Sequence, residues 1–307
     1  MTAPARRVRP ARASARMHAA PSRIDAASAG ADSDSSRMGS ASAGMDAPSP
    51  THTAPPIVAA PAGLRALAAR VRERFEAFVN DPAFSCLGAR AALHHDAYRF
   101  GAYGKIGSGE ATAALARDLA AFAREEGASE FATFVAAFVD VAPDSEHDFE
   151  ARLWAQLQAL HAADPGPGWD AAVSDDPADP AFSFSFAGRA FFIVGLHPES
   201  SRLARRFGWP VLVFNPHAQF QRLRADGRYG RLRETIRARE LALQGSLNPN
   251  LAEFGEESEA RQYSGRATGG EWACPFHRLS AGDAAGARAP AEDASFRRPS
   301  PSTPPGR

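Results

Sequence analysis

The chain has 307 residues, 44% of them hydrophobic, and a formal net charge of zero at pH 7. This length suits one large domain or two ordinary ones, and the neutral charge predicts neither a nucleic-acid partner nor a strongly acidic substrate. No apolar run approaches the roughly 18 residues of a membrane span. The two cysteines, Cys86 and Cys274, are too few and too far apart for a disulfide framework. We therefore expect a cytoplasmic protein with reduced cysteines and no membrane segment.

The two ends of the chain, residues 1–60 and 280–307, consist mainly of Ala, Ser, Pro, Arg and Gly. Such segments bury too little apolar surface to offset the entropy lost on folding, so we expect disordered tails. Residues 61–279 are then predicted to form a single folded domain.

Four segments have apolar residues at the spacing of an amphipathic helix. They are residues 63–80, 110–126, 146–162 and 229–244. Residues 200–207 are long enough for about two further helical turns. The Gly-rich residues 99–109 are expected to form an exposed loop rather than a phosphate-binding loop, because the spacing of the glycines does not fit.

Short runs of aromatic and β-branched residues predict strands at 131–139, 191–196 and 211–214. Residues 182–186 alternate with period two and are joined to the 191–196 strand by Ala187, Gly188 and Arg189, which predicts a hairpin. Because helices and strands alternate while one strand pair is antiparallel, we expect an α/β (or α+β) fold. Its mixed central sheet would be flanked by helices.

Two histidines lie beside prolines at the ends of predicted strands, His197 after residues 191–196 and His217 after residues 211–214. Loops at strand ends are frequent places for sites, so these turns are candidates. A turn histidine that bonds nearby backbone is an equally good interpretation of either one. The spacing of the histidines and cysteines specifies no zinc site, and Cys86 alone is best interpreted as a small buried hydrophobe.

Arg202 and Arg206 are four residues apart in the predicted short helix, so they would share one face. Two guanidinium groups on one face suit a carboxylate or a phosphate, although a solvated helix face is the simpler interpretation. Residues 256–266 hold three acids, two arginines and a tyrosine, which form either a clasp for a charged substrate or a surface salt-bridge patch. The residue patterns alone therefore indicate a site but no reaction.

Five segments, in their order along the chain, resemble the YqcI/YcgG-like family. They read FSFSFAGRAFFIVGLHPESSRLARRF, VLVFNPHAQFQRLR, IRARELALQGSLNP, SEARQYSGR and WACPF. The resemblance runs from about Asp81 to Phe276 and leaves out both tails. Members with assigned roles are haem-dependent enzymes of natural-product pathways that hydroxylate a guanidine nitrogen. The resemblance thus implies a haem-dependent monooxygenase of secondary metabolism that acts on a small arginine-like guanidine or amine.

The resemblance also implies a set of partners and site residues. The partners would be haem b with its iron, O₂ and an external electron donor, and a homodimer is left open. His197 is the first candidate for the axial ligand and Cys274 the next, with His217 and Cys86 also open. Glu259, or else Glu256, would orient the guanidinium, with Tyr263 and His217 as further catalytic candidates.

The remaining candidates would hold the cofactor. Arg202 and Arg206 would meet the haem propionates, and Arg266 is a further cofactor-binding candidate. Phe192 and Phe214, with Phe184 and Phe186, would form the walls of the slot. A haem- or anion-binding module without turnover, such as a sensor or carrier, is the alternative from another functional class.

Overall fold

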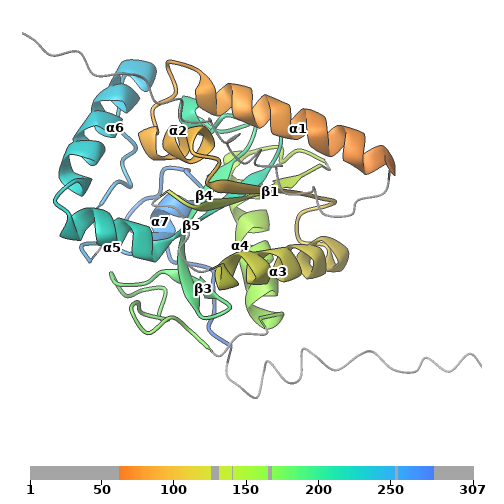
Figure 1. Ribbon diagram of the computed structural model, residues 1–307. Coiled ribbons are helices and arrows are strands. Elements are labelled where there is room, and N and C mark those ends of the chain that lie inside the picture. The colour runs from red at the N-terminus through yellow and green to blue at the C-terminus, as the bar shows by residue number, and fades with distance from the viewer. Residues whose placement is uncertain (1–61, 126–130, 140, 165–167, 253–254, 280–307) are drawn as a thin grey trace, which may run out of the picture. The chain divides into compact units, whose positions relative to one another are not determined.

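The computed structural model describes residues 62–125, 131–139, 141–164, 168–252 and 255–279 (Figure 1). All of them belong to one compact unit, His52–Arg307. The two predicted tails, residues 1–60 and 280–307, lie outside the described residues. The first helix begins at Ala62.

A five-stranded mixed sheet forms the centre of the described structure, in the order β1-β2-β5-β4-β3. The strands are β1 (Tyr98–Tyr103), β2 (Thr133–Phe138), β3 (Phe184–Phe186), β4 (Arg189–Leu196) and β5 (Val211–Pro216). Strands β1 and β2 are parallel, whereas β2–β5, β5–β4 and β4–β3 are antiparallel. The predicted α/β class, the mixed sheet and the β3–β4 hairpin are confirmed.

Two predicted elements differ from the structure. Residues 98–103, which open the expected Gly-rich loop, form the edge strand β1, because the aromatic rings of Tyr98, Phe100 and Tyr103 are buried. Residues 200–207 contain only a single 3₁₀ turn, η1 (Leu203–Arg205), instead of two helical turns. The backbone there bonds back to His197, whose N–H donates to the Arg205 carbonyl at 3.0 Å, so the segment closes a loop.

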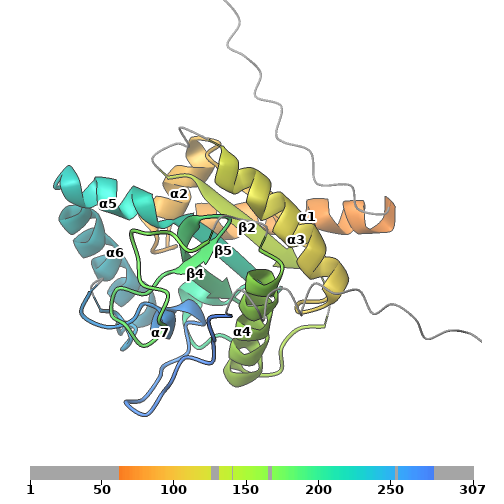
Figure 2. The same cartoon turned by 90° about the horizontal axis from the view of Figure 1, so that it is seen from below.

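One face of the sheet is covered by α3 (Gly109–Arg124), α4 (Glu146–Ala162) and the short α7 (Ala260–Tyr263) (Figure 2). The side chains on this face pack into an aromatic core, and we call it the filled face. Fully buried members of that core are Phe138, Phe149, Leu153, Phe184, Phe186, Phe191, Phe214 and Tyr263.

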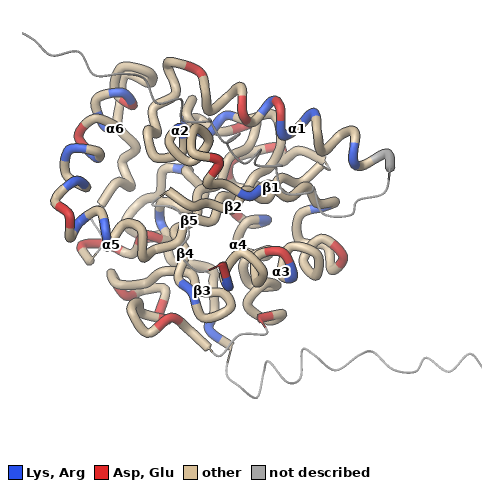
Figure 3. The backbone as a smooth tube through the Cα atoms, viewed as in Figure 1, with Lys and Arg blue, Asp and Glu red and all other residues tan. Residues whose placement is uncertain are grey.

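The other face carries α1 (Ala62–Asn80), α2 (Leu87–His94), α5 (His217–Ala225) and α6 (Tyr229–Gln244). Helix α1 buries Val71, Phe75 and Val79 against this face. Helix α6 has no buried residue, and basic and acidic side chains follow one another along it (Figure 3). We call this side of the sheet the cavity face, because a cavity lies against it. None of the described helices combines the length and the apolar character that crossing a bilayer requires.

Candidate functional site

A cavity of about 290 Å³ lies between the cavity face of the sheet and helices α2, α5 and α6. Its floor includes Val135, Val213 and Val194, which are direct neighbours across β2, β5 and β4. The volume is close to the lower end of the roughly 300–1,000 Å³ found for small-molecule and cofactor sites. The valines explain the space, because they are shorter than the phenylalanines that occupy the filled face.

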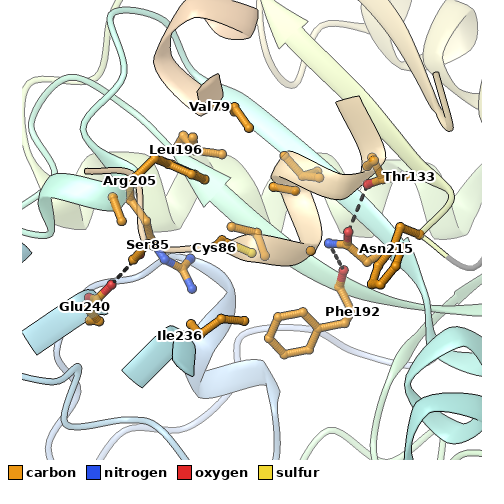
Figure 4. Close-up of a pocket in the computed structure, with 18 of the residues that line it drawn as sticks. Val79, Ser85, Cys86, Thr133, Phe192, Leu196, Arg205, Asn215, Ile236 and Glu240 are labelled. Atoms are coloured by element: carbon orange, nitrogen blue, oxygen red, sulfur yellow. Dashed lines mark hydrogen bonds between the residues drawn. The ribbon is translucent and has the colours of Figure 1, made fainter. Parts of the chain in front are cut away.

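One wall of the cavity is fixed by a chain of hydrogen bonds (Figure 4). The Thr133 hydroxyl donates to Asn215 Oδ1 at 2.9 Å, and Asn215 Nδ2 donates to the Phe192 carbonyl at 3.2 Å. The Asn215 amide is therefore held in one orientation across three strands. This arrangement gives the cavity a rigid edge.

A charged cluster lies at the opposite end of the cavity, where Glu240 of α6 meets Arg202 and Ser85. Arg202 Nε donates to Glu240 Oε1 at 3.1 Å, and the Ser85 hydroxyl donates to Oε2 at 2.9 Å. Arg202 also donates to the Ser246 hydroxyl at 3.0 Å. The cluster joins α6 to the loop before α2 and to the 3₁₀ turn.

Arg205 is enclosed beside this cluster and is held by two backbone carbonyls. Its Nη1 donates to Tyr263 O at 3.0 Å and approaches Gly195 O at 3.4 Å. Burial lowers the pKa of the Arg205 guanidinium to about 10, so it stays protonated at neutral pH. The described lining holds three arginines, Arg237 being the third, against the single acid Glu240, and has a formal excess of positive charge.

Cys86 is the N-cap residue of α2 and faces the cavity. Burial raises the pKa of its thiol, while the N–H groups of Gly88 and Ala89 and the charge of Arg205 act in the opposite direction. Those N–H groups lie near the sulfur without forming an ordinary side-chain cap hydrogen bond. Among the described residues that line the cavity, Cys86 supplies the only sulfur, and no histidine is present.

The two predicted histidines do not come together. Strands β4 and β5 are antiparallel, with Leu196 opposite Val211 and Phe191 opposite Pro216. His197 and His217 therefore follow opposite ends of the sheet, about 20 Å apart along a six-residue strand at ~3.3 Å per residue. Neither histidine lines the cavity.

Both histidines are buried, and burial lowers the pKa of each imidazole to about 4. His197 stacks on Phe149 with ring centroids 4.1 Å apart. Neither ring nitrogen of His197 has a hydrogen-bond partner in the described part of the protein. His217 is the first residue of α5. Both imidazoles are neutral at physiological pH.

Glu259 and Tyr263 belong to a buried network at the edge of β4 and not to the cavity. Glu259 Oε1 accepts hydrogen bonds from the Ser183 and Tyr263 hydroxyls, each at 2.7 Å. The Tyr263 oxygen also accepts from the Phe184 N–H at 3.1 Å, which ties α7 to β3. Burial raises the pKa of the Glu259 carboxyl to about 7, against the effect of those two donors. The geometry is that of a structural anchor.

The other predicted residues are divided between the two faces. Arg202 and Phe192 line the cavity. Cys274 packs against the filled face, where burial raises the pKa of its thiol to about 12. Neither Arg206 nor Arg266 is among the described residues that line the cavity. Phe214, Phe184 and Phe186 belong to the aromatic core, and Glu256 is exposed.

Arg206 follows the 3₁₀ turn, and its Nε donates to the Ser200 carbonyl at 2.8 Å. Arg266 pairs with Glu150 of α4, with Nε 2.9 Å from Oε2. Both arginines therefore stabilise loops, and neither reaches the cavity. The predicted pair of forks on one helix face is wrong, because no helix forms over residues 200–207.

Arg205 and Glu240 line the cavity but are not among the site residues predicted from the sequence, whereas Cys86 is one of the candidates left open for the axial ligand. A signal existed for Glu240, because Leu232, Ile236 and Glu240 are each four residues apart and share one face of α6. A carboxylate is unusual on the apolar face of a helix, so its presence there indicates that it has a specific role. For Cys86 and Arg205 no comparable pattern exists, because their meeting depends on the folded chain.

Comparisons with known proteins agree with the resemblance noted above. A Streptomyces lavendulae protein named "Putative N(omega)-hydroxy-L-arginine synthase DcsA" is 37% identical over 105 residues. The match covers 32% of this chain and 38% of that protein, so the chain spans well under half the length of this relative. No solved structure matches the chain. The family model for YqcI/YcgG matches residues 75–277, which include every described strand and the cavity, and the chain belongs to the YqcI/YcgG family.

Proposed function

We propose that the chain is a haem-dependent monooxygenase that hydroxylates a guanidine or amine nitrogen of a small arginine-like substrate. The observation that carries the proposal is the cavity, which combines apolar walls, an excess of arginine and one sulfur atom. The printed name of the Streptomyces relative, an N-hydroxy-L-arginine synthase, supports the reaction type.

The lining residues fit a haem b by their chemistry. Haem needs an apolar slot, cations for its two propionates and one axial donor from the protein. Val135, Val194, Val213 and Phe192 supply apolar surface, and Arg202, Arg205 and Arg237 supply positive charge. When bound, the group would supply the oxygen-activating chemistry.

The protein's own contribution is binding, orientation and exclusion of water. The valine floor would exclude water from the reacting nitrogen, which limits side reactions. The arginines can bind a carboxylate of an arginine-like substrate as well as a propionate. Glu240 is the one acid among the described lining residues, so a substrate guanidinium would find its carboxylate partner there rather than at Glu259.

The overall reaction consumes one O₂, two electrons and two protons. One oxygen atom is inserted into the N–H bond of the substrate to give N–OH, and the other leaves as water. An external two-electron donor, such as a reduced nicotinamide acting through a redox protein, completes the balance.

The test is to express the full chain with a haem precursor and record the absorption spectrum. A Soret band is expected, followed by products 16 mass units heavier when L-arginine or agmatine is supplied with O₂ and a reductant. A protein that neither carries haem nor takes up haemin contradicts the proposal.

A module that binds a haem or another anion without turnover is the second candidate, and the excess of arginine in the cavity favours it. This candidate predicts saturable binding of the ligand but no N-hydroxylated product with any guanidine or amine tested. Product analysis under reducing conditions therefore separates the two candidates.

A further inference from the structure

The choice of iron ligand can be argued from the lining of the cavity, on the condition that the proposed function is right. Proteins bind haem iron axially through His, Cys, Met or Tyr side chains. Among the described residues that line the cavity, Cys86 is the only one of these types. Because the porphyrin nitrogens supply the in-plane ligands, one axial donor from the protein is sufficient.

The position of Cys86 at a helix N-terminus partly offsets the burial that raises the pKa of its thiol, and iron binding would itself favour the thiolate. A sulfur at a helix N-terminus is stabilised as an anion by the first N–H groups and the helix dipole. Cys86 occupies this position on α2, with the N–H groups of Gly88 and Ala89 nearby. The carbonyl of Cys86 accepts from the Arg90 N–H at 3.3 Å, which fixes the residue to the helix.

A second, separate feature is the cation beside this sulfur. Arg205 interacts electrostatically with both Cys86 and Glu240. Its Nη1 is anchored to the carbonyls of Tyr263 and Gly195, which prevents the side chain from swinging away. Figure 4 shows the Arg205 guanidinium and the Cys86 sulfur directed toward the same space. Arg205 thus holds a positive charge in place on the side of the cavity where Cys86 lies.

The other candidate ligands lie elsewhere. Cys274 packs against the filled face, and His197 stacks on Phe149 of α4. His217 begins α5 at the far end of the sheet and does not line the cavity. Each would need the backbone to move before it could reach a group bound in the cavity.

We propose that Cys86 is the axial thiolate ligand of the haem iron, and that Arg205 is a positioning residue that holds a positive charge beside this sulfur. The inference rests on the proposed function, because it requires haem in this cavity.

The first experiment compares spectra of the haem-loaded full-length protein and three variants. The wild type should give the red-shifted Soret band of a thiolate-ligated ferrous carbonyl complex. Cys86→Ser should lose this band, whereas Cys274→Ser, the matched cysteine control, and His197→Ala should keep it. An unchanged Cys86→Ser spectrum, or loss of the band in Cys274→Ser alone, overturns the assignment of the ligand while leaving haem binding intact. A wild type that takes up no haem overturns the proposed function and this inference together.

A second measurement uses the wild-type protein, so it does not require the Cys86→Ser variant to fold. Iodoacetamide labelling of the wild-type protein, followed by mass spectrometry, reports the access to each thiol with and without haemin. Haemin should lower the labelling of Cys86 at least tenfold and leave Cys274 unchanged. Equal labelling of Cys86 in both states contradicts the proposal even when Cys86→Ser is insoluble.

Arg205 is tested through the reduction potential of the iron. Removing the positive charge in Arg205→Gln should make the potential more negative, because the ferric state is then less opposed by a nearby cation. Arg205→Lys should restore most of the wild-type value, since it keeps the charge. A merely structural role predicts the same potential in all three proteins, and that result rejects the role of Arg205.

Discussion

The two faces of the central sheet begin from the same strands and differ in what lies against them. The filled face sends phenylalanines such as Phe191 and Phe214 into a core closed by α3, α4 and α7. The cavity face presents Val135, Val194 and Val213 to helices α2, α5 and α6, and about 290 Å³ is left between them. Side-chain size on alternate positions of each strand is the physical difference.

Polar groups on the two faces also differ in kind. On the filled face, Tyr263 bonds Glu259 and Arg266 pairs with Glu150, while both ring nitrogens of His197 and Trp154 Nε1 have no partner in the described part of the protein. On the cavity face the described lining holds three arginines and one acid, and the thiol of Cys86 faces the cavity. The space for a ligand and the excess of positive charge therefore occur together on the cavity face.

The strongest test of this division uses two neighbouring residues that point to opposite faces. Phe214→Ala should lower the free energy of unfolding by about 3–5 kcal/mol, because the ring is fully buried and packs on Phe134 and Phe191. Val213→Ala, the control, should cost clearly less, because part of its surface already faces the cavity. Urea unfolding of both variants measures the difference, and equal losses would contradict the contrast between the faces.

The buried acid of the filled face should make stability depend on pH. The pKa of Glu259 is about 7 in the folded protein, above the ordinary value of 4.5, so the folded state holds its proton longer than the unfolded chain. The free energy of unfolding therefore falls as pH rises from about 4.5 to 7, by up to about 3 kcal/mol. Glu259→Gln, which still accepts both hydrogen bonds but cannot titrate, should lack this fall.

The measurement is the difference between the unfolding free energies of the Gln variant and the wild type across this pH range. His197 and His217, whose pKa values are lowered to about 4, make stability fall as pH drops from 6.5 toward 4. Their contribution is present in both proteins and cancels in the difference. A difference that is flat with pH would show that the Glu259 carboxyl is not perturbed.

A glycine on the filled face should resist enlargement. A Cβ added at Gly195 would lie 2.5 Å from the Phe149 ring and 2.9 Å from the Tyr263 carbonyl. Gly195→Ala should therefore cost about 1–3 kcal/mol, as overpacking does. Gly208→Ala is the control, because a Cβ there meets nothing within 4 Å. Thermal unfolding compares the two, and a neutral Gly195→Ala would show that the core has room.

The smallest change in stability is expected where the cavity is filled. Val213→Phe places a ring in open space and should alter the free energy of unfolding by less than about 1.5 kcal/mol. It should nevertheless abolish haemin binding, measured by spectral titration. Ile193→Phe, on the filled face, should destabilise more without blocking the cavity. If a folded Val213→Phe protein still binds haemin, the haemin site lies outside this cavity.

Local pattern predicted most of the elements, because helix and strand periodicity is written in neighbouring residues. Helix α4 spans Glu146–Ala162 as the stripe of Phe149, Leu153 and Leu157 indicates, and the β3–β4 hairpin has the expected partners. Strand β1 was missed because Gly101 within it, together with the glycines that follow it, resembles a loop and hides the alternate burial of Tyr98 and Phe100. The family could likewise be recognised from five sequence segments that occur in a fixed order, and the match over residues 75–277 confirms it.

The site depended on contacts that no local pattern contains. Antiparallel pairing of β4 and β5 separates His197 from His217, although each follows a strand. Pairing also sets which positions share a face, so that Phe192 lies beside Asn215 on the cavity face while Phe214 lies beside Ile193 on the other. Ser85 and Glu240 meet across 155 residues of sequence. The sequence by itself determined the elements and the family, and only tertiary packing decided that Cys86, Arg205 and Glu240 line one cavity.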